Sequence, residues 1–206
     1  MPYRVVEDFE ERVAAYAGAK HAVAVESCTA ALFLSCVYRK VGDVFIPKRT
    51  YPGVPCSIIH AGGRVNFTDQ EWAGTYELAP WGIVDGALRF RRDMYHGGFH
   101  CLSFHIKKLL PMGRGGMILT DDEKARDWFR LARFDGRHPV PLKDDNFTML
   151  GWNVYMTPDQ AARGIQLFEL IKNKSLADLS VEEQGYPDLS RYDCYKRRPV
   201  LGQRSR

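Results

Sequence analysis

Short apolar runs alternate with helical segments along most of this chain, and that alternation constrains the fold more than any other feature. Runs of strand length occur at 21–25, 44–47, 64–69, 82–85, 99–104 and 117–120. Most are separated by stretches whose apolar residues recur with helical spacing. Strands that alternate with helices form mainly parallel sheets, because each helix carries the chain back along the sheet. The sequence therefore predicts an α/β fold with a mainly parallel sheet covered by helices on both faces.

Start and stop signals indicate where the helices lie. The first helix is expected from Phe9, with Asp8 as its N-cap, and the last is expected from Pro158. The helices are expected to end near residues 17, 40, 61, 134 and 171. The stretch 70–80 is polar and irregular, and the chain from 172 to 206 shows little periodicity.

Length and composition indicate one globular domain with a small appendage. The chain has 206 residues, of which 45% are hydrophobic and 26% are charged, as in an ordinary globular protein. No apolar run reaches the length of a membrane-spanning helix, so no membrane association is expected. The net charge of +4 does not require a nucleic acid partner, and no basic patch interleaved with aromatic residues supports one. The basic residues within 196–206 are expected to form a solvated tail.

The five cysteines indicate reduced thiols. They include no CxxC pair and no histidine at the spacing of a zinc site, so no metal site is predicted. Their odd number, together with an N-terminus that has no hydrophobic signal region, favours a cytoplasmic protein. Three of them lie in apolar stretches and are expected in the core.

Four side chains of functional interest follow the ends of predicted strands. They are Thr29, Tyr51, Asp85 and Lys108. Ligands bind beyond the carboxyl ends of strands in such sheets, so these side chains are expected to share one site. The Ser-Cys-Thr turn at 27–29 leads from a strand into a helix, whose first N–H groups would attract a phosphate. A simple Ser or Thr helix cap is the alternative interpretation of that turn.

The segment from Ser103 to Gly116 lies between two predicted strands and contains a serine, two adjacent lysines and three glycines. A lysine at a strand end has a lowered pKa when it is desolvated, and its neutral amine could then hold an aldehyde as a Schiff base. A solvated pair of surface lysines is the alternative interpretation.

Six segments, in order along the chain, resemble the DegT/DnrJ/EryC1/StrS family of sugar aminotransferases. The spacing Ser-Phe-His-x-x-Lys-x-Leu-x-x-Gly-x-Gly-Gly at 103–116 resembles the cofactor-lysine segment of that family. The other segments are the opening at 9–25, Ser-Cys-Thr-Ala-Ala-Leu at 27–32, the Thr-Tyr element at 47–51, Val-Asp-Gly-Ala at 84–87, and Leu-Gly-Trp-Asn-Val-Tyr-Met-Thr at 150–157 with Gln-Ala-Ala at 160–162. The resemblance implies fold type I of the transferases that depend on pyridoxal 5'-phosphate, and it implies that cofactor.

The resemblance also implies roles for residues around the cofactor ring. Lys108, rather than its neighbour Lys107, would hold the cofactor and later move protons as a general acid and base. Asp85 would keep the pyridine nitrogen protonated, because an opposite charge favours the charged form. Tyr51 would offer its flat apolar ring for stacking.

Further roles concern the phosphate, the substrates and a second subunit. By resemblance, the backbone amides of Cys28 and Thr29 and the hydroxyl of Ser103 would hold the phosphate. The counterpart of Asn153 in the family reaches the phosphate of the neighbouring subunit, which implies a homodimer with shared active sites. The implied substrates are a keto-sugar nucleotide and an amino acid donor, with glutamate as the expected donor.

Four substitutions set this chain apart from the family pattern. Cys28 stands in place of a glycine, where its side chain could crowd the phosphate turn. Leu88 replaces a glutamine that would bond the phenolic oxygen of the cofactor. Arg114 replaces a glutamate beside the lysine segment, and Tyr155 replaces an arginine.

The chain is also short for the family. The interval 69–85 lacks a strand–helix unit that relatives carry, and the C-terminal small domain is expected to be mostly missing. Residues 1–171 are therefore expected to form the cofactor-binding large domain, and 172–206 a short polar extension.

Two classes of function follow from these observations. The first is an aminotransferase that acts on a keto-sugar nucleotide; the presence of Lys108 favours it over the dehydratase branch of the family, in which a histidine takes that place. The alternative is a non-catalytic relative that binds pyridoxal phosphate or acts as a scaffold, and the four substitutions and the short chain favour it. A nicotinamide enzyme is disfavoured, because the glycines at 113–116 lack the Gly-x-Gly-x-x-Gly spacing.

Overall fold

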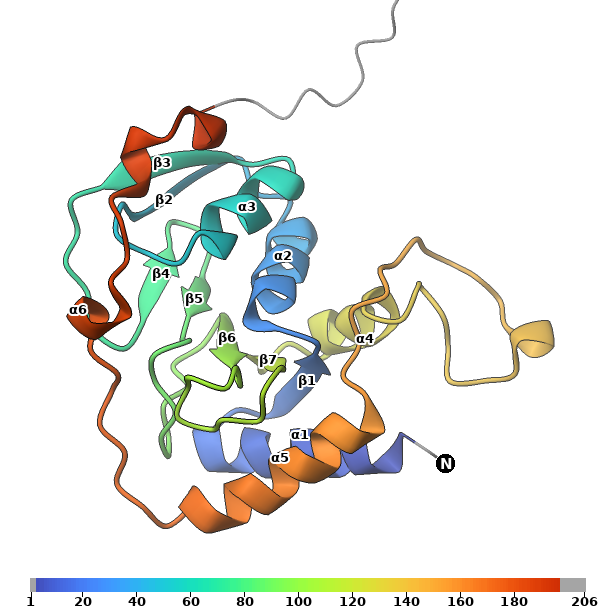
Figure 1. Ribbon diagram of the computed structural model, residues 1–206. Helices are drawn as coiled ribbons and strands as arrows, with labels where there is room; N and C mark the ends of the chain where they lie inside the picture. Colours follow the sequence, from blue (N-terminus) through green and yellow to red (C-terminus); the bar gives the residue numbers. More distant parts are fainter. Residues whose placement is uncertain (1–2, 197–206) are drawn as a thin grey trace, which may run out of the picture.

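The computed structural model describes residues 3–196 and shows an α/β fold (Figure 1). A five-stranded sheet has the order β1-β7-β6-β5-β4, and a two-stranded sheet pairs β2 with β3. Two backbone hydrogen bonds between Phe45 and Ala79, with N to O distances of 2.9 and 3.1 Å, link β2 to the end of β4. The strands are β1 (His21–Val25), β2 (Asp43–Pro47), β3 (Arg64–Thr68), β4 (Tyr76–Leu78), β5 (Ile83–Asp85), β6 (Phe99–Ser103) and β7 (Gly116–Thr120).

Strand pairing in the larger sheet is mixed rather than mainly parallel. β5 pairs with β6 in parallel, whereas β1 with β7, β6 with β7, and β4 with β5 pair antiparallel. The cause lies in the connections. A short turn at 79–82 joins β4 to β5 and a loop at 104–115 joins β6 to β7. Neither connection contains a helix, so the chain returns beside the strand that it has just left.

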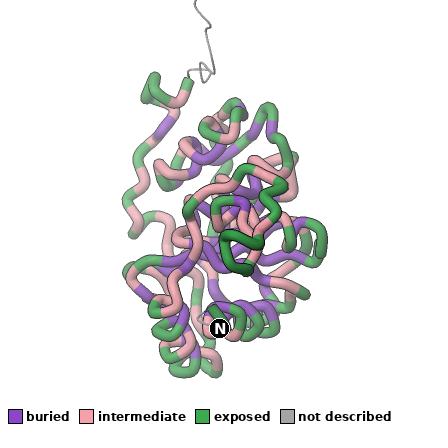
Figure 2. Tube along the Cα trace, turned by 90° about the vertical axis from the view of Figure 1, so that its right-hand side faces the viewer, coloured by how far each residue is buried: buried purple, intermediate pink, exposed green. Residues whose placement is uncertain are grey.

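Helices cover both faces of the sheet, as predicted. Side chains of α1 and α5 pack against one face of the five-stranded sheet, and those of α2 and α4 pack against the other, whereas α3 packs against α2 and β3. Figure 2 shows many of the buried segments in the interior of the molecule and exposed segments along its outer edges. The longer helices are α1 (Arg4–Ala17), α2 (Cys28–Arg39), α3 (Gly53–His60), α4 (Glu123–Ala132) and α5 (Pro158–Ile171). Shorter ones are α6 (Val181–Gln184), η1 (Leu142–Asp144), η2 (Leu189–Arg191) and η3 (Asp193–Tyr195).

Two sequence-based expectations about these elements are wrong. Helix α1 begins at Arg4 rather than at Phe9, and Asp8 is not its cap but pairs with Arg4 across one turn, at 3.0 Å from Nε to Oδ1. Burial of Val6 extends the apolar face of the helix by one turn. The stretch 70–80 is not wholly irregular, since it contains β4, whose three residues are too few for a recognisable alternation.

Other expectations are confirmed. Gly18 ends α1 in a left-handed conformation, with φ of 82°. Pro158 is the first residue of α5, and Thr157 and Gln160 form a capping box before it. All five cysteines are free, and three of them, Cys28, Cys36 and Cys101, are buried. Within residues 3–196, no helix is long and apolar enough to span a membrane.

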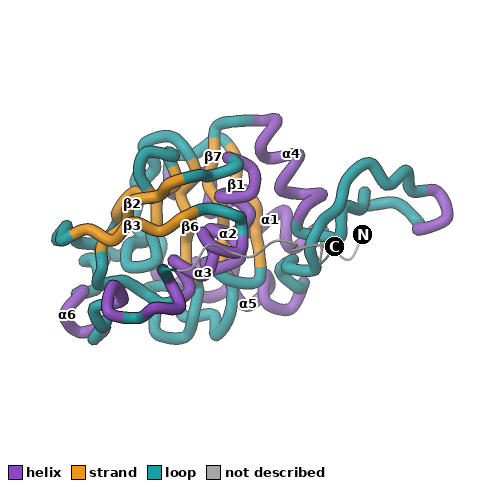
Figure 3. The backbone as a smooth tube through the Cα atoms, turned by 90° about the horizontal axis from the view of Figure 1, so that it is seen from above, coloured by secondary structure: helices purple, strands orange, loops and turns teal. Residues whose placement is uncertain are grey.

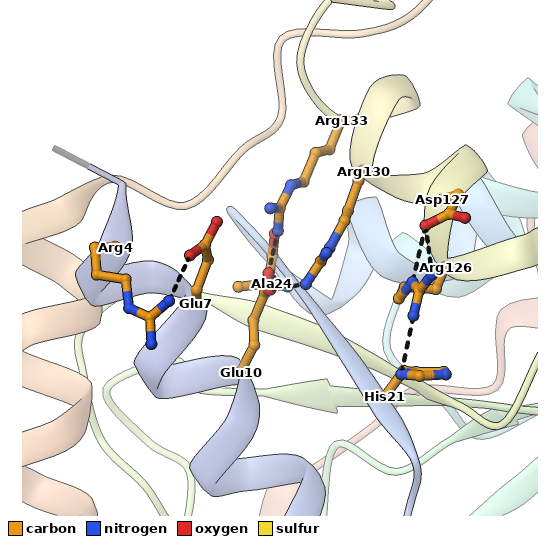
Figure 4. A network of polar contacts seen from close by, with 9 residues as sticks. All are labelled: Arg4, Glu7, Glu10, His21, Ala24, Arg126, Asp127, Arg130 and Arg133. Carbon is orange, nitrogen blue, oxygen red and sulfur yellow. Dashed lines mark hydrogen bonds and ion pairs between the residues drawn. The ribbon is translucent and has the colours of Figure 1, made fainter. Parts of the chain in front are cut away.

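A buried carboxylate ties α1 to β1 and α4 (Figure 4). Glu10 is 2% exposed, and its Oε1 accepts a hydrogen bond of 2.8 Å from the N–H of Ala24. Arg133 and Arg130 of the α4 region both pair with Glu10, and Arg133 also donates to the Ala24 carbonyl at 2.6 Å. A carboxylate in this position is stable because every polar group around it has a partner.

Glu10→Ala is therefore expected to lower the free energy of unfolding by about 3 kcal/mol, because it removes the carboxylate partner of Arg133 and leaves the Ala24 N–H without its acceptor. Glu11→Ala is the matched control, since Glu11 is an exposed residue of the same helix. Urea denaturation followed by circular dichroism measures both variants. Equal stability of the two would contradict a structural role for the Glu10 cluster.

Candidate active site

A cavity of about 440 Å³ lies at the ends of several strands and contains most of the residues singled out from the sequence. Six of the predicted site residues line it: Cys28, Thr29, Tyr51, Asp85, Ser103 and Lys108. Asn153 does not. Its side chain donates to Asp135 at 2.8 Å, on the segment between α4 and α5.

The start of α2 forms one wall of this cavity. Ser27 is the N-cap, and its Oγ accepts from the N–H of Ala30 at 3.1 Å. Cys28 and Thr29 are the first helical residues, and N–H groups in the first turn have no acceptor within the helix. Those N–H groups and the positive end of the helix dipole favour an anion at this point.

Gly116 allows β7 to pass close beneath this turn. A Cβ atom at Gly116 would lie 2.3 Å from the carbonyl carbon of Ser27, which is closer than atoms can approach. Gly115, with φ of 149°, forms an isolated bridge with Ser27 beside it. Gly116 therefore permits the close approach, and Gly115 the backbone conformation, that bring the β6–β7 loop against the turn before α2.

The side chain of Cys28 contacts the sheet. Its thiol donates to the carbonyl oxygen of Cys101 at 3.5 Å, and burial raises the pKa of the thiol well above its ordinary value. Cys28 is therefore a neutral core residue whose backbone borders the cavity, with its sulfur held against β6.

The loop between β6 and β7 distinguishes the two lysines. Its first turn is held by the N–H of Lys108, which donates to the carbonyl of His105 at 2.8 Å. Lys107 is exposed, whereas Lys108 is partly buried. Burial lowers the pKa of Lys108, although the charge of Asp85 acts in the opposite direction. Of the two, Lys108 is the amine that is shielded from water and more readily neutral.

Asp85 ends β5 as a buried carboxylate that is 3% exposed. Its Oδ2 accepts from the Tyr76 hydroxyl at 3.1 Å, and its Oδ1 accepts from the N–H of Ala87 at 2.9 Å. Burial raises the pKa of Asp85, and these two hydrogen bonds and the charge of Lys108 oppose that rise. Among residues 3–196, no cationic side chain forms an ion pair with Asp85. A cationic group in the cavity would supply the missing partner.

Tyr76 is a site residue that the sequence analysis missed. The antiparallel pairing of β4 with β5 places Tyr76 directly opposite Asp85, and the Thr50 hydroxyl lies 2.5 Å from the Tyr76 oxygen. Since Tyr76 donates its proton to Asp85, Thr50 donates to Tyr76. The reason is that β4 has only three residues, too few for a recognisable alternation in the sequence.

Trp72, Gln184 and Tyr186 also line the cavity and were missed. Trp72 lies in the polar stretch 70–80. Its ring stacks on that of Tyr186, with the ring centroids 6.3 Å apart and an interplanar angle of 12°. Gln184 and Tyr186 belong to the extension after α5, whose polar composition gives no local signal of a site.

The remaining departures from the family pattern are accommodated locally. Arg114 lines the cavity and forms an ion pair of 2.7 Å with Glu26, so the reversed charge is neutralised nearby. Leu88 is fully buried, and Tyr155 packs edge-on against Phe134 with ring centroids 4.8 Å apart.

Comparison with known proteins places this arrangement in a family. The model of the DegT/DnrJ/EryC1/StrS aminotransferase family matches residues 1–83 and 94–176. This chain belongs to that family. The match includes the β6–β7 loop with Lys108, and it leaves out 84–93, where Asp85 and Leu88 lie.

Relatives and solved structures of the family resemble the chain over most of its length. It is 29% identical to the spore coat polysaccharide biosynthesis protein SpsC of Bacillus subtilis, over 64% of this chain and 46% of the relative. It is 25% identical to GDP-perosamine synthase of Caulobacter vibrioides, over 82% of this chain and 57% of the relative. The chain thus spans about half the length of the curated relatives it matches.

Two solved structures share the fold. The aminotransferase TlmJ from Streptoalloteichus hindustanus superposes with a TM-score of 0.70 at 21% identity, over 80% of this chain and 58% of TlmJ. The structure of DesI in the presence of its TDP-sugar product has a TM-score of 0.66 at 23% identity, over 81% of this chain and 53% of DesI. These likenesses confirm the expected fold type.

Enzymes of the DegT/DnrJ/EryC1/StrS family use pyridoxal phosphate, and the residues of the cavity fit that group. The start of α2 suits its phosphate, the partly buried Lys108 suits its aldehyde, and the buried Asp85 suits its ring nitrogen. The fit rests on Asp85 in particular, because a buried carboxylate without an ion-pair partner calls for a cation in the cavity.

Proposed function

We propose that this chain is a pyridoxal-phosphate-dependent aminotransferase that transfers an amino group from glutamate to a keto-sugar nucleotide. One observation carries the proposal: a shielded lysine and a buried aspartate without an ion-pair partner border the same cavity, beside the free N–H groups of a helix start. The names of GDP-perosamine synthase and of DesI with its TDP-sugar product support a sugar nucleotide as the substrate.

Each residue would make a distinct contribution. Bound pyridoxal phosphate supplies an electron sink that the protein itself lacks. The N–H groups of Cys28 and Thr29, with the Ser103 hydroxyl, would hold its phosphate, and Tyr51 would cover its ring. Asp85 would keep a proton on the ring nitrogen. Lys108 Nζ, with its lowered pKa, would remove and return the proton at the carbon that bears the amine.

A direct assay tests this function. Purified protein would be supplied with pyridoxal phosphate, glutamate and a set of nucleotide-linked keto-sugars, and mass spectrometry would detect the amino-sugar nucleotide with stoichiometric 2-oxoglutarate. Product formation that requires both substrates is the expected result. Cofactor binding without product from any keto-sugar would contradict the proposal.

That second outcome would favour the alternative, a non-catalytic relative that binds the cofactor. The observation in its support is that the family match omits 84–93 and that the chain spans about half the length of its relatives. The two functions differ in turnover and not in cofactor binding, so the assay separates them.

We further propose that the protein is a homodimer with shared active sites. The segment between α4 and α5 projects from the body of the molecule (Figures 1 and 3). It presents apolar side chains to solvent, with Leu142 60%, Phe147 58% and Leu150 91% exposed. Burial of these side chains against a second copy would be favourable, and it would bring Asn153, which lies outside its own cavity, toward the partner.

Mixing two inactive variants is expected to restore activity if the sites are shared. Lys108→Ala and Asn153→Ala would each have strongly reduced turnover alone. After subunit exchange, a mixed dimer contains one site with both native residues, so about a quarter of all sites should be intact. Turnover of the mixture against each variant alone measures this, and sedimentation gives the oligomeric state. A monomer that binds pyridoxal phosphate tightly would contradict the shared site.

A further inference from the structure

The segment that follows α5 crosses one side of the molecule as an extended chain, which we call the C-terminal strap (residues 176–190). In Figure 1 it runs from the end of α5, through α6, to the edge formed by β2 and β3. The family match ends at residue 176, so the resemblance assigns no role to the strap.

The first anchor of the strap lies next to β5. The Asp178 carboxylate accepts two hydrogen bonds from the Arg89 guanidinium, at 2.9 Å from Nε to Oδ1 and 2.5 Å from Nη2 to Oδ2. The N–H of Leu179 donates to the carbonyl of Leu88 at 2.9 Å. The pair is largely shielded from solvent, with the Arg89 side chain 18% and the Asp178 side chain 21% exposed. Two N–H groups of the guanidinium bond the two carboxylate oxygens, and this bidentate geometry gives the strongest Arg–carboxylate pairs.

The second anchor lies next to β2. The N–H of Leu189 donates to the carbonyl of Lys48 at 2.9 Å, and the Leu189 side chain is buried. Asp188 lies 3.8 Å from the Lys48 ammonium. The two anchors attach the strap to segments that follow β5 and β2, and the cavity lies between them.

Between the anchors, Gln184 and Tyr186 reach the cavity from the strap. The Gln184 Oε1 accepts a hydrogen bond of 3.2 Å from the Lys108 Nζ. Tyr186 stacks on Trp72, and burial together with the nearby charge of Asp85 raises the pKa of its phenol. The strap therefore contacts the amine that is expected to hold the cofactor, and it lies near the aspartate that is expected to bind the cofactor ring.

The strap borders the cavity instead of filling it. With Gln184 and Tyr186 in place, about 440 Å³ remains, which lies within the range of typical small-molecule sites. A segment that blocked the site would leave no such space. The remaining space and the two anchors indicate that the C-terminal strap forms a wall of the cavity.

We propose that the C-terminal strap is part of the cofactor site, where Gln184 positions the Lys108 amine and the Tyr186–Trp72 pair retains bound pyridoxal phosphate. The proposal rests on the proposed function, since it takes pyridoxal phosphate as the ligand. Gln184 is a positioning residue, because it acts through the amine of Lys108.

The contact with Lys108 can be tested without any cofactor. In the cofactor-free full chain, Gln184→Ala is expected to speed acetylation of Lys108 by roughly tenfold, because the lost hydrogen bond both frees the amine and favours its neutral form. Lys107 in the same molecule is the internal reference, and Glu183→Ala, an exposed neighbour on the strap, is the matched control. Mass spectrometry of the Lys108 peptide measures the rate. An unchanged rate for Gln184→Ala would overturn the positioning role.

Retention of the cofactor tests the wall. The double variant Asp178→Ala/Asp188→Ala loosens both anchors, and Tyr186→Ala removes the stacked ring. Each is expected to release pyridoxal phosphate about tenfold faster than the wild-type chain, whereas Glu183→Ala should release it at the wild-type rate. Release is followed by absorbance after dilution into a trap, with circular dichroism to confirm that each variant is folded.

The possible results separate this inference from the proposed function. If the wild-type chain binds pyridoxal phosphate and the anchor variant releases it at the wild-type rate, the proposed role of the strap in retaining the cofactor is wrong, and the proposed function is unaffected. Slower release of pyridoxal phosphate from those variants would show that the strap competes with the cofactor, and this result would also contradict a retaining role for the strap. A wild-type chain that binds no pyridoxal phosphate would overturn the proposed function and the retention together.

Discussion

Lys108→Ala is expected to abolish covalent attachment of pyridoxal phosphate and to reduce transamination by at least ~10²-fold, while Lys107→Ala retains both. The physical reason is the difference in environment between two adjacent lysines. Lys108 is partly buried, its pKa is lowered by that burial, and its amine faces the cavity near Asp85. Lys107 also borders the cavity, but its side chain is exposed to water.

Borohydride reduction followed by peptide mass spectrometry measures this directly. The reduced cofactor should add its mass to Lys108 in the wild-type chain and in Lys107→Ala, and no lysine should carry it in Lys108→Ala. The adjacent substitution is a close control, because it changes the same loop and removes the same charge. Attachment that disappears only in Lys107→Ala would show that the assignment is shifted by one residue.

Asp85→Ala is expected to leave the protein folded, to weaken retention of pyridoxal phosphate and to lower turnover by roughly 10²-fold. Without the carboxylate, nothing in the described cavity wall keeps the ring nitrogen of the cofactor protonated. Asp85→Asn, whose amide oxygen can still accept from the N–H of Ala87 while its NH2 group can donate to the Tyr76 oxygen, should lose turnover to a similar extent. Normal transamination by either variant would contradict this role for Asp85.

The pH dependence of stability gives an independent test of Asp85 in the cofactor-free protein. Burial raises its folded-state pKa, so ionisation of Asp85 destabilises the fold. That penalty is absent below the ordinary aspartate pKa of about 3.9 and grows as pH rises through the raised value. The unfolding free energy of Asp85→Asn should therefore increase relative to that of the wild type as pH rises from about 4 until it passes the raised pKa of Asp85. Urea denaturation measures the gap, and a gap that does not change with pH would contradict the buried carboxylate.

Tyr76→Phe extends this test to the residue behind Asp85. The Tyr76 hydroxyl stabilises the ionised carboxylate, so its removal should raise the pKa of Asp85 further. The stability of Tyr76→Phe should consequently begin to fall near the same pH as that of the wild type and continue to fall to a higher pH. Carboxyl NMR of the cofactor-free protein would follow the same titration at Asp85 itself.

Local patterns in the sequence determined much of this protein. The strands at β1, β5, β6 and β7 follow from short apolar runs, and the ends of α1 and α5 follow from Gly18 and Pro158. Each of these signals lies within a few residues of the chain, so it can be recognised in the sequence without knowledge of the fold. The order of the motifs also identified the family. The positions after the strands predicted four of the residues that line the cavity, and the family resemblance added Cys28 and Ser103.

Tertiary structure alone decided the direction of β4 and the path of the strap. Both depend on contacts between residues far apart in the chain: Thr50 and Tyr76 are 26 residues apart, Lys108 and Gln184 are 76 apart, and Arg89 and Asp178 are 89 apart. A three-residue strand and a polar extension carry little periodicity of their own. Their positions follow from the hydrogen bonds and ion pairs that become available only after the sheet has assembled, which is why Tyr76, Gln184 and Tyr186 could be placed at the site only from the structure.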